Sequence, residues 1–339
     1  MRVLLIKTSS MGDIIHTLPA LTDAGRAMPG ITFDWLVEDA FTEIPSWHPL
    51  VDQVIPVSLR RWRKEIFSRA TRTALKALRK RLHEQQYDLI LDAQGLVKSA
   101  FLTFFAKGKR VGLDWESARE ALASLAYQQK CTVNFYQHAI PRMRILFSEA
   151  LGYTLPESPP DFGINRESLQ KSNQAENYLV FLHGTTWMTK QWPMAYWIEL
   201  AELVGQAGYR VKISGGSAEE MKRAEEIASQ STAVDVMPRL SISAMAEMLA
   251  NAKAAIAVDT GLGHLAAALN VPTISLYGPT NPDYTGALGN SSIHLAAEFP
   301  CAPCLSRICT YKEPSAIIPA CFGTLTPLRV WNRVRPFLG

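Results

Sequence analysis

Two hydroxyls and a lysine follow one of the apolar runs of the sequence, in a pattern suited to binding a diphosphate. The segment HGTTWMTKQWP (183–193) carries Thr185, Thr186 and Lys190. These groups could hold a diphosphate and neutralise the charge that develops on it as it leaves. The alternative is a solvated loop before a helix that Pro193 begins.

The segment VDTGLGHLAAAL (258–269) has the same order of apolar run, small loop and helix pattern. Asp259 ends the run, Thr260 and Gly261 leave backbone N–H groups uncrowded, and His264 opens the helix. Backbone amides at a helix N-terminus bind anions, and a histidine there can add a donor. A tight turn with an aspartate cap is the alternative.

A third turn, SGGSAEE (214–220), places Glu220 at the start of another helix pattern. Glu220 could accept hydrogen bonds from ribose hydroxyls, or it could be a favourable acid in the first helical turn. The three turns, 185–190, 215–220 and 259–264, all follow apolar runs of the second half. Because parallel strands end at one sheet edge, their convergence favours a nucleotide site over three unrelated turns.

The first half contains one comparable turn, KTSSMGDIIHTLPAL (7–21). A helix begins near Asp13, where the positive end of the helix dipole keeps a carboxylate ionised and able to accept a proton. Asp13 is therefore a candidate general base. It could also serve only to cap the helix.

A basic run, RRWRK, also lies in the first half. Its cations could bind clustered carboxylates and phosphates, or form a solvated helix face. With one further arginine, the candidate anion-binding residues are Arg60, Arg61, Arg63, Lys64 and Arg119.

Four of the five cysteines lie close together, at Cys301, Cys304, Cys309 and Cys321. A CxxC pair with two further cysteines could hold a structural zinc ion, although the spacing matches no standard zinc finger. Separately packed, reduced thiols are the alternative, because disulfides are rare in cytosolic proteins.

These residues need elements to position them, and apolar runs alternate with helix-length patterns along most of the chain. The expected strands are 3–6, 33–37, 53–57, 88–92, 110–113, 178–182, 210–214, 233–237, 254–258 and 272–277. The expected helices include 63–86, 139–151, 194–207, 219–229 and 242–251. Continuous apolar strands separated by helices predict an α/β protein with parallel sheets covered on both faces. Two such series predict two doubly wound, Rossmann-like domains.

The Pro-rich, polar stretch 153–177 predicts the boundary between these domains. We expect an N-terminal domain over 1–160 and a C-terminal domain over 161–322. Thr326 and Pro327 begin a further helix pattern, so residues 323–339 should form a terminal helix that could pack back on the N-terminal domain.

Composition narrows the functional classes. The 339 residues are 47% hydrophobic and 19% charged, which excludes a disordered chain. Lysine and arginine number 35 against 31 acidic residues, a net charge of +4, so a general nucleic-acid binder is not expected. No run is long enough for a signal-peptide core or a membrane span, which predicts a soluble cytoplasmic protein.

Several of these segments resemble a known family. The 7–21 segment, HGTTWMTKQWP, and VDTGLGHLAAAL followed by SLYGPTNP are similar to the bacterial lipopolysaccharide heptosyltransferases of glycosyltransferase family 9. RRWRK, LDAQGLVKSA (91–100), DWESARE (114–120) and QHAIPR (137–142) resemble the heptosyltransferase I branch in particular. The resemblance covers roughly residues 1–290, and the cysteine-bearing tail departs from the enterobacterial members.

The resemblance implies a GT-B fold, in which two Rossmann-like domains face a cleft, and an inverting transfer without a metal or cofactor. The donor would be ADP-L-glycero-β-D-manno-heptose and the acceptor the Kdo residue of Kdo-lipid A. The enzyme would be a monomer, peripheral on the cytoplasmic face of the inner membrane, with an acceptor-binding N-terminal domain and a donor-binding C-terminal one.

The resemblance also implies a role for each candidate residue. Asp13 matches the catalytic base. The matches to donor contacts are Thr185, Thr186 and Lys190 for the diphosphate, Glu220 for the nucleoside, Asp259 for a heptose hydroxyl, and Thr260, Gly261 and His264 around the diphosphate. The basic residues facing the acidic acceptor are Arg60, Arg61, Arg63, Lys64 and Arg119.

Three other functions stay open from the sequence. Heptosyltransferase II or another family 9 transferase would use a different core acceptor, although the RRWRK run suits the more anionic Kdo region. A nucleotide-sugar epimerase of the same fold would be expected to bind a uridine nucleotide. A non-catalytic module could use the cysteines to bind metal and keep only a vestigial nucleotide site.

Overall fold

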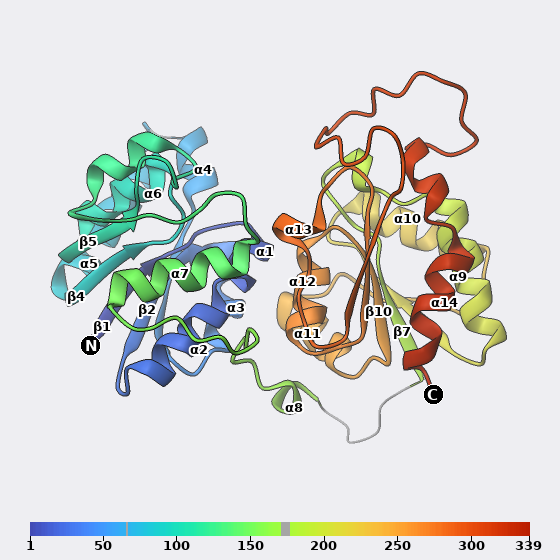
Figure 1. Ribbon diagram of the computed structural model, residues 1–339, viewed down its shortest axis with the longest axis horizontal. Coiled ribbons are helices and arrows are strands. Elements are labelled where there is room, and N and C mark those ends of the chain that lie inside the picture. The colour runs from blue at the N-terminus through green and yellow to red at the C-terminus, as the bar shows by residue number, and fades with distance from the viewer. Residues whose placement is uncertain (66, 171–176) are drawn as a thin grey trace. The chain divides into compact units, whose positions relative to one another are not determined.

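A computed structural model describes residues 1–65, 67–170 and 177–339 of the chain. It divides into two compact units, unit 1 (Met1–Gly163) and unit 2 (Ile164–Gly339) (Figure 1). Each unit is built from one uninterrupted stretch of the chain. Residues 171–176, within the expected boundary stretch 153–177, lie outside the described residues.

Unit 1 is built around a six-stranded parallel sheet of order β3-β2-β1-β4-β5-β6. Its strands are β1 (Arg2–Ile6), β2 (Thr32–Glu38), β3 (Val51–Val57), β4 (Gln86–Asp92), β5 (Lys107–Leu113) and β6 (Gln129–Cys131). The central strand β1 is buried from Val3 to Ile6, since helices cover both faces. The first five strands confirm the expected ones, whereas β6 was not predicted, because its sequence QKC has no apolar run.

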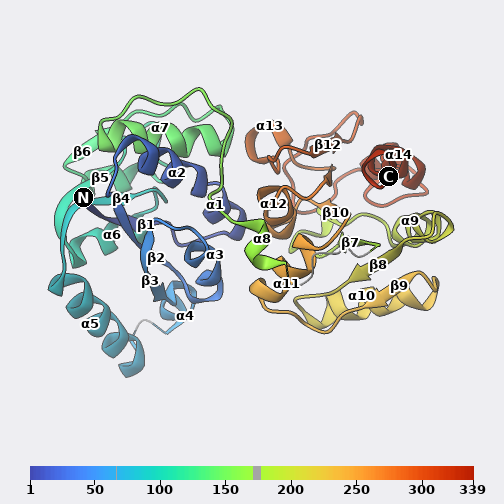
Figure 2. The ribbon, with the colours of Figure 1, turned by 90° about the horizontal axis from the view of Figure 1, so that it is seen from below.

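Helices cover both faces of this sheet. They are α1 (Met11–Ile15), α2 (Leu18–Ala27), α3 (Glu43–Ser46), α4 (Leu59–Lys64), α5 (Arg69–Glu84), α6 (Val97–Leu102) and α7 (Ala139–Leu151), with short 3-10 helices η1 (Asp39–Phe41), η2 (Thr103–Phe105) and η3 (Ala121–Ala126). Leu78 and Leu82 of α5 pack with Leu4 and Ile6 on one face. The helices α2 and α7 lie on the other face, where Phe147 of α7 contacts Phe33 (Figure 2).

Unit 2 contains a second parallel sheet, of order β12-β11-β10-β7-β8-β9. Its strands are β7 (Tyr178–Leu182), β8 (Arg210–Ile213), β9 (Val234–Val236), β10 (Ala254–Val258), β11 (Thr273–Tyr277) and β12 (Ser292–Ala296). The central strands β7, β10 and β11 are buried at every position. The edge strand β12 was not predicted, because its sequence SIHLA mixes polar and apolar residues.

The helices of unit 2 also lie on both faces (Figure 2). They are α8 (Arg166–Leu169), α9 (Met194–Gln206), α10 (Ala218–Ser229), α11 (Ile242–Ala250), α12 (Gly261–Ala268), α13 (Pro282–Thr285) and α14 (Pro327–Val334), with 3-10 helices η4 (Met188–Lys190), η5 (Ala320–Thr324) and η6 (Arg335–Phe337). Trp197 and Leu200 of α9 pack with Phe181 and Ile213 in one core cluster. On the other side of the sheet, the Tyr178 hydroxyl donates to the Met248 carbonyl of α11.

The terminal helix begins at Pro327, and the Thr326 side chain caps it by accepting a hydrogen bond from the Arg329 amide. Val330 and Val334 join the core of unit 2 with Leu200 and Val204 of α9. The strongly one-sided apolar face of the helix is buried there. That the helix also packs back on the N-terminal domain stays a prediction.

The two sheets share one topology. In each, the strand order reverses between two neighbouring central strands, β1 and β4 in unit 1 and β7 and β10 in unit 2. The loops that leave two such strands diverge to opposite faces, which opens a crevice at their carboxyl ends where ligands bind. The functional residues of each unit should therefore lie at this switch point.

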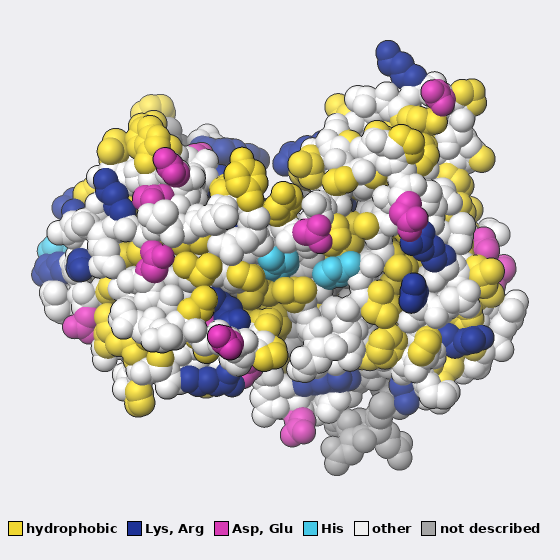
Figure 3. All heavy atoms as spheres, in the orientation of Figure 1, with side chains coloured by type: hydrophobic (Ala, Val, Ile, Leu, Met, Phe, Trp, Pro, Cys, Tyr) yellow, Lys and Arg dark blue, Asp and Glu magenta, His cyan; other side chains and the backbone are white. Residues whose placement is uncertain are grey.

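One surface of unit 1 exposes large apolar side chains. Phe101 of α6, Phe104 of η2, and Leu122 and Leu125 of η3 are 57%, 53%, 62% and 69% exposed. We call these four residues the apolar patch, and Figure 3 shows hydrophobic side chains gathered near α6. The four side chains stay exposed because α6 and η3 contact each other through the small residues Ala100 and Ala123. Within the described parts of the chain, no helix is both long enough and apolar enough to cross a membrane.

Candidate active site

An ion pair crosses the switch point of unit 2. Nζ of Lys190, in the turn after β7, lies 2.6 Å from Oδ2 of Asp259, which directly follows β10. The same oxygen accepts a hydrogen bond of 2.7 Å from Oγ1 of Thr280. Asp259 is buried, and its two partners compensate for the loss of water around the carboxylate. The structure thus brings together two residues that the sequence singled out separately.

The turn that carries Lys190 is held by aromatic contacts. Nζ of Lys190 lies 4.5 Å from the centre of the Trp187 ring, and the Arg307 guanidinium lies 4.9 Å from the same ring. Such contacts attract cations to the ring face. Thr185 is half-buried and Thr186 is exposed just before this turn, so both hydroxyls lie at the carboxyl end of β7. Hydroxyls and a cation are therefore gathered beside the switch point.

Helix α12 begins at this edge of the sheet. Thr260 is its N-cap residue, Gly261 its first residue, and His264 is buried in its first turn. The first N–H groups of a helix have no intrahelical acceptor and carry positive partial charge. Gly263 permits close packing of the helix on β10, because a Cβ there would lie 3.0 Å from the Cβ of Ala257. The arrangement suits an anionic group next to Lys190.

Glu220 lies over the end of β7. Its Oε2 accepts a hydrogen bond of 2.7 Å from the Gly216 amide, and Ser217 caps the helix that carries it. A Cβ at Gly184 would lie 2.6 Å from the carboxyl carbon of Glu220, so a larger residue there would displace the Glu220 carboxylate. All three predicted turns of the second half therefore meet at the carboxyl ends of β7, β8 and β10.

Asp13 lies at the corresponding edge of unit 1, in helix α1 directly after β1. Its Oδ2 accepts hydrogen bonds from the Ser10 amide at 2.7 Å and the Ser10 hydroxyl at 2.8 Å. Asp13 thus does cap the start of its helix, as the structural alternative predicted. Its side chain is half-buried, and both of these hydrogen bonds use the same carboxylate oxygen, Oδ2. Capping and proton acceptance are therefore compatible.

Two further cations of unit 1, Lys7 and Arg142, interact electrostatically with Asp13. Burial lowers the pKa of Lys7, and the charges of Asp13 and Asp92 oppose that shift. Burial also lowers the pKa of Arg142 in α7, and the charge of Asp13 again opposes it. Arg142 donates to the Ser117 carbonyl, while its Nε is buried with no hydrogen-bond partner among the described residues.

Residues after β4 complete this switch point. Oε1 of Gln94 accepts from the Thr8 and Ser9 amides at 2.9 and 3.1 Å, and so fixes the loop before Asp13. Lys7 donates to the Ala93 carbonyl. Asp92 is fully buried; burial raises its pKa, while Tyr127 donates a hydrogen bond of 2.8 Å to it. The sequence signal that could have indicated these residues is the LDAQG segment (91–95). Its polar side chains come at the end of an apolar strand, as in the other predicted turns.

The basic run forms helix α4, which follows β3 at the edge of the unit 1 sheet. Its four cations, Arg60, Arg61, Arg63 and Lys64, are exposed. Trp62, within the same run, is 8% exposed and packs in the core. Arg119, also exposed, lies after β5, and its charge contributes to lowering the pKa of Lys7. In the sheet order, β5 lies on the other side of β1 from β3, which α4 follows.

The four clustered cysteines line one small cavity in unit 2. Cys301, Cys304 and Cys309 are exposed and Cys321 is buried, and none is in a disulfide. Burial, and then the charges of the other three cysteines, raises the pKa of the Cys321 thiol to about 11. Among the residues that the structure describes, no three histidine, cysteine or acidic side chains stand in metal-binding geometry.

Comparisons with known proteins agree on one family. Residues 75–314 match the model of glycosyltransferase family 9 (heptosyltransferase). The chain is similar to lipopolysaccharide heptosyltransferase 1 of Pseudomonas aeruginosa, with 53% identity over all of this chain and 98% of the relative.

Solved structures agree. The structure of E. coli heptosyltransferase WaaC with ADP matches with a TM-score of 0.89 and 43% identity, covering 99% of this chain and 100% of that one. The same enzyme with ADP-2-deoxy-2-fluoro heptose matches with a TM-score of 0.85 and 43% identity over 99% of each chain. The two Rossmann-like units thus have the fold of these heptosyltransferases. The chain belongs to glycosyltransferase family 9, and it is a glycosyltransferase.

Proposed function

We propose that this enzyme transfers L-glycero-D-manno-heptose from ADP-heptose to the Kdo residue of Kdo-lipid A, a step of lipopolysaccharide inner-core synthesis. The observation that carries the proposal is the 53% identity over the whole chain to a lipopolysaccharide heptosyltransferase 1. The cationic turn and helix N-terminus at the unit 2 switch point are consistent with an ADP-sugar donor.

Unit 2 holds the donor. Thr185, Thr186 and Lys190 contact the diphosphate, together with Thr260, Gly261 and His264 of the α12 turn, while Glu220 accepts from the nucleoside and Asp259 from a heptose hydroxyl. Lys190 and the amides of α12 are fixed positive groups next to the leaving ADP. They supply the charge stabilisation that a divalent ion supplies elsewhere, so we propose that the transfer needs no metal.

Asp13 of unit 1 is the general base. It takes the proton from the Kdo hydroxyl as that oxygen attacks the anomeric carbon and the bond to ADP breaks. One direct displacement inverts the anomeric configuration. Arg142 and Lys7 stabilise the carboxylate before proton transfer and keep it oriented, since both lie near it in a buried setting.

The acceptor is anionic, and the proposal assigns it to the exposed cations of unit 1. Arg60, Arg61, Arg63 and Lys64 of α4, with Arg119, face its carboxylates and phosphates. Their exposure leaves them free to form bidentate and charge-assisted hydrogen bonds with those groups. We propose that the enzyme acts as a monomer.

An ADP-release assay tests the proposed reaction. Purified ADP-heptose should yield ADP with Kdo-lipid A, and little with an acceptor that already carries the first heptose. The anomeric configuration of the product, read by NMR, tests inversion. Activity after exhaustive EDTA treatment tests metal independence. Preference for the heptosylated acceptor would make the enzyme a transferase of a later heptose instead.

We also propose that unit 1 contacts the inner membrane on its cytoplasmic face through the apolar patch. The patch is flanked by cations: Lys98 is exposed on α6, and the Arg110 guanidinium lies 4.7 Å from the Phe104 ring centre. Exposed apolar side chains bordered by cations favour an anionic lipid surface, where the rings enter the headgroup region. Such contact would bring the enzyme to its lipid-anchored acceptor.

Vesicle flotation checks the membrane proposal. The protein should float with vesicles containing anionic phosphatidylglycerol, and less with pure phosphatidylcholine. Replacing Phe101 and Leu125 by Ser should reduce flotation, whereas Leu328→Ser, which alters a residue 54% exposed on α14 of unit 2, should not. Equal flotation of the patch variant and the wild type would contradict the proposal.

A further inference from the structure

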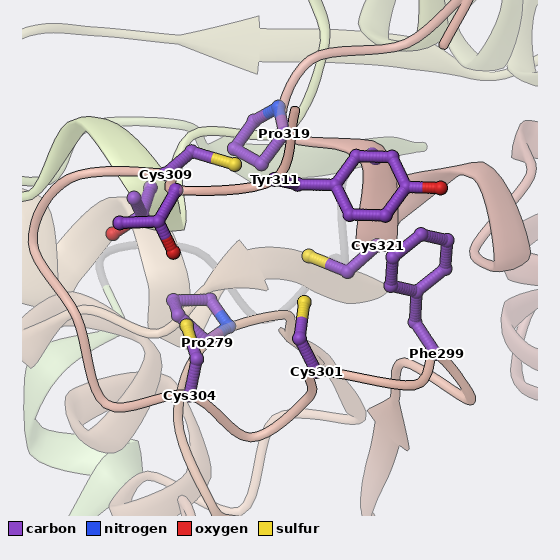
Figure 4. Close-up of a pocket in the computed structure, with 11 residues that line it drawn as sticks. Pro279, Phe299, Cys301, Cys304, Cys309, Tyr311, Pro319 and Cys321 are labelled. Atoms are coloured by element: carbon purple, nitrogen blue, oxygen red, sulfur yellow. The ribbon is translucent and has the colours of Figure 1, made fainter. Parts of the chain in front are cut away.

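Four sulfur-bearing side chains from separate positions converge on one place in unit 2. Cys301, Cys304 and Cys309 lie in the long segment between β12 and η5, and Cys321 lies in η5. All four line a cavity of about 20 Å³ (Figure 4). A space of that size holds one water-sized particle. The cavity is therefore suited to a single ion rather than to an organic ligand.

The chemistry of the lining is that of a closed thiolate site. Thiolates select soft and borderline divalent ions, and four of them form the tetrahedral set typical of a structural zinc or iron ion. Cys321 is fixed in the core of unit 2, whereas the other three are exposed on a segment in which the structure assigns no helix or strand before η5. Among the described residues the present sulfur positions form no metal-binding group, so coordination requires the three exposed cysteines to move toward Cys321.

The segment between these cysteines rests directly on the turn that carries Lys190. Oγ1 of Thr189 donates a hydrogen bond of 2.7 Å to the Ser306 carbonyl. The Leu305 amide donates at 2.7 Å to the Pro279 carbonyl, next to Thr280, the partner of Asp259. Leu305 and Ser306 lie between Cys304 and Cys309 in the sequence. Fixing these two cysteines would therefore also fix the hydrogen bonds of the segment to Thr189, next to Lys190, and to Pro279, next to Thr280.

We propose that Cys301, Cys304, Cys309 and Cys321 bind one divalent metal ion, zinc or iron, which clamps residues 301–309 against the turn of Lys190. The ion is structural and takes no part in the chemical step. Thr189 acts as the positioning residue between the clamp and Lys190. The effect on the donor rests on the proposed function, whereas metal binding does not depend on it.

Elemental analysis tests the site. Full-length protein purified under reducing conditions without chelators should contain about one zinc or iron per chain, and the element found identifies the ion. Cys304→Ser and Cys309→Ser, both at exposed positions, should fold and lose most of the metal. Cys131→Ser removes a buried cysteine of unit 1 and should keep it.

Cobalt substitution gives a second readout that does not depend on activity. Metal-free protein titrated with Co²⁺ should develop the intense visible bands of a tetrahedral thiolate complex, and Cys304→Ser should not. Metal-free wild-type protein that neither binds zinc nor gives these bands would overturn the proposal. So would thiol titration showing that the four cysteines form disulfides.

The clamp is tested through ADP affinity. By calorimetry, metal-free protein should bind ADP more weakly than loaded protein. Thr189→Val should keep the metal and weaken ADP binding about 2- to 10-fold, the effect of losing one hydrogen bond. If metal-free wild type and metal-loaded Thr189→Val both bind ADP as tightly as the loaded wild type does, the clamp is overturned. If ADP does not bind even the loaded wild type, the proposed donor function fails while the metal content still decides the site.

Discussion

The ammonium of Lys190 and the carboxylate of Asp259 share an ion pair of 2.6 Å that joins the turn after β7 to the end of β10. Both side chains are largely buried, so their mutual attraction is only weakly screened by water. An incoming diphosphate would offer Lys190 a second anion. Donor binding should therefore redistribute an existing interaction instead of recruiting a free lysine from solvent.

Lys190→Ala should lower kcat strongly and weaken ADP binding less, because negative charge on the leaving diphosphate grows as its bond breaks. ADP should raise the melting temperature of the wild type without magnesium, by an amount set by its affinity. Steady-state kinetics and thermal shift measurements check both expectations. Lys222→Ala removes an exposed lysine of α10 and should match the wild type. A magnesium requirement for the ADP shift would contradict a metal-free site.

Replacing Arg60, Arg61 and Arg63 by Ala should raise the acceptor KM and leave the donor KM nearly unchanged. Loss of a uniform binding contact has this effect, and the difference should shrink at high salt because exposed charges are screened. A matched control removes three exposed cations of α5, Lys76, Arg79 and Lys80. If both KM values rise equally, the α4 arginines do not recognise the acceptor.

Asp13→Asn should lower kcat by about 10²–10⁴, the usual range for losing a general base. Its amide oxygen can still accept a hydrogen bond from Ser10, so the melting temperature should change little. ADP-heptose affinity should also persist. Asp88→Asn, at an exposed position of β4, controls for the loss of a negative charge. A stable Asp13→Asn enzyme with near wild-type kcat would leave Asp13 as a helix cap only.

Stability should decline in acid through His48. Burial lowers the pKa of His48 from 6.5 to about 4, and Nδ1 accepts a hydrogen bond from the Leu50 amide. The unfolded chain takes up a proton below pH 6.5 and the folded chain only near pH 4, so unfolding becomes favoured as pH falls through this window. The loss should reach on the order of 3 kcal/mol at the acid end.

Thermal unfolding from pH 7 to pH 4 measures this effect. In His48→Asn the amide oxygen can replace Nδ1 as the acceptor, so the decline should become shallower. His83→Asn alters an exposed histidine of α5 and should follow the wild-type curve. Identical curves for His48→Asn and the wild type would assign the acid sensitivity to other groups.

The sequence predicted the elements whose residues are uniformly apolar, and the turns that follow them. Buried parallel strands such as β7 and β10 require continuous apolar runs, so these were visible. The order of strands in each sheet then brings Lys190 next to Asp259, which a linear pattern cannot reveal. The short strands β6 and β12 lie at sheet edges, where half-exposed positions admit polar residues and weaken the signal.

Side-chain direction was less predictable than position. Trp62 lies among four cations in sequence, yet helical periodicity turns it into the core while the cations face solvent. The charge of Asp13 acts on Arg142 of α7, which is distant from it in the sequence. Cys321 joins the other cysteines only because a long segment folds back to η5. Contacts between residues that are distant in the sequence depend on tertiary packing, which the spacing of residues along the chain does not reveal.

Because α14 packs within unit 2, neither unit needs a segment from the other half of the chain to complete its core. During synthesis, every strand of the unit 1 sheet leaves the ribosome before β7 begins at Tyr178. Domains of this kind generally fold as units, in the order in which they are made. The base-bearing unit can therefore reach its native state while the donor-binding unit is still being translated, which limits misassembly between two sheets of identical topology.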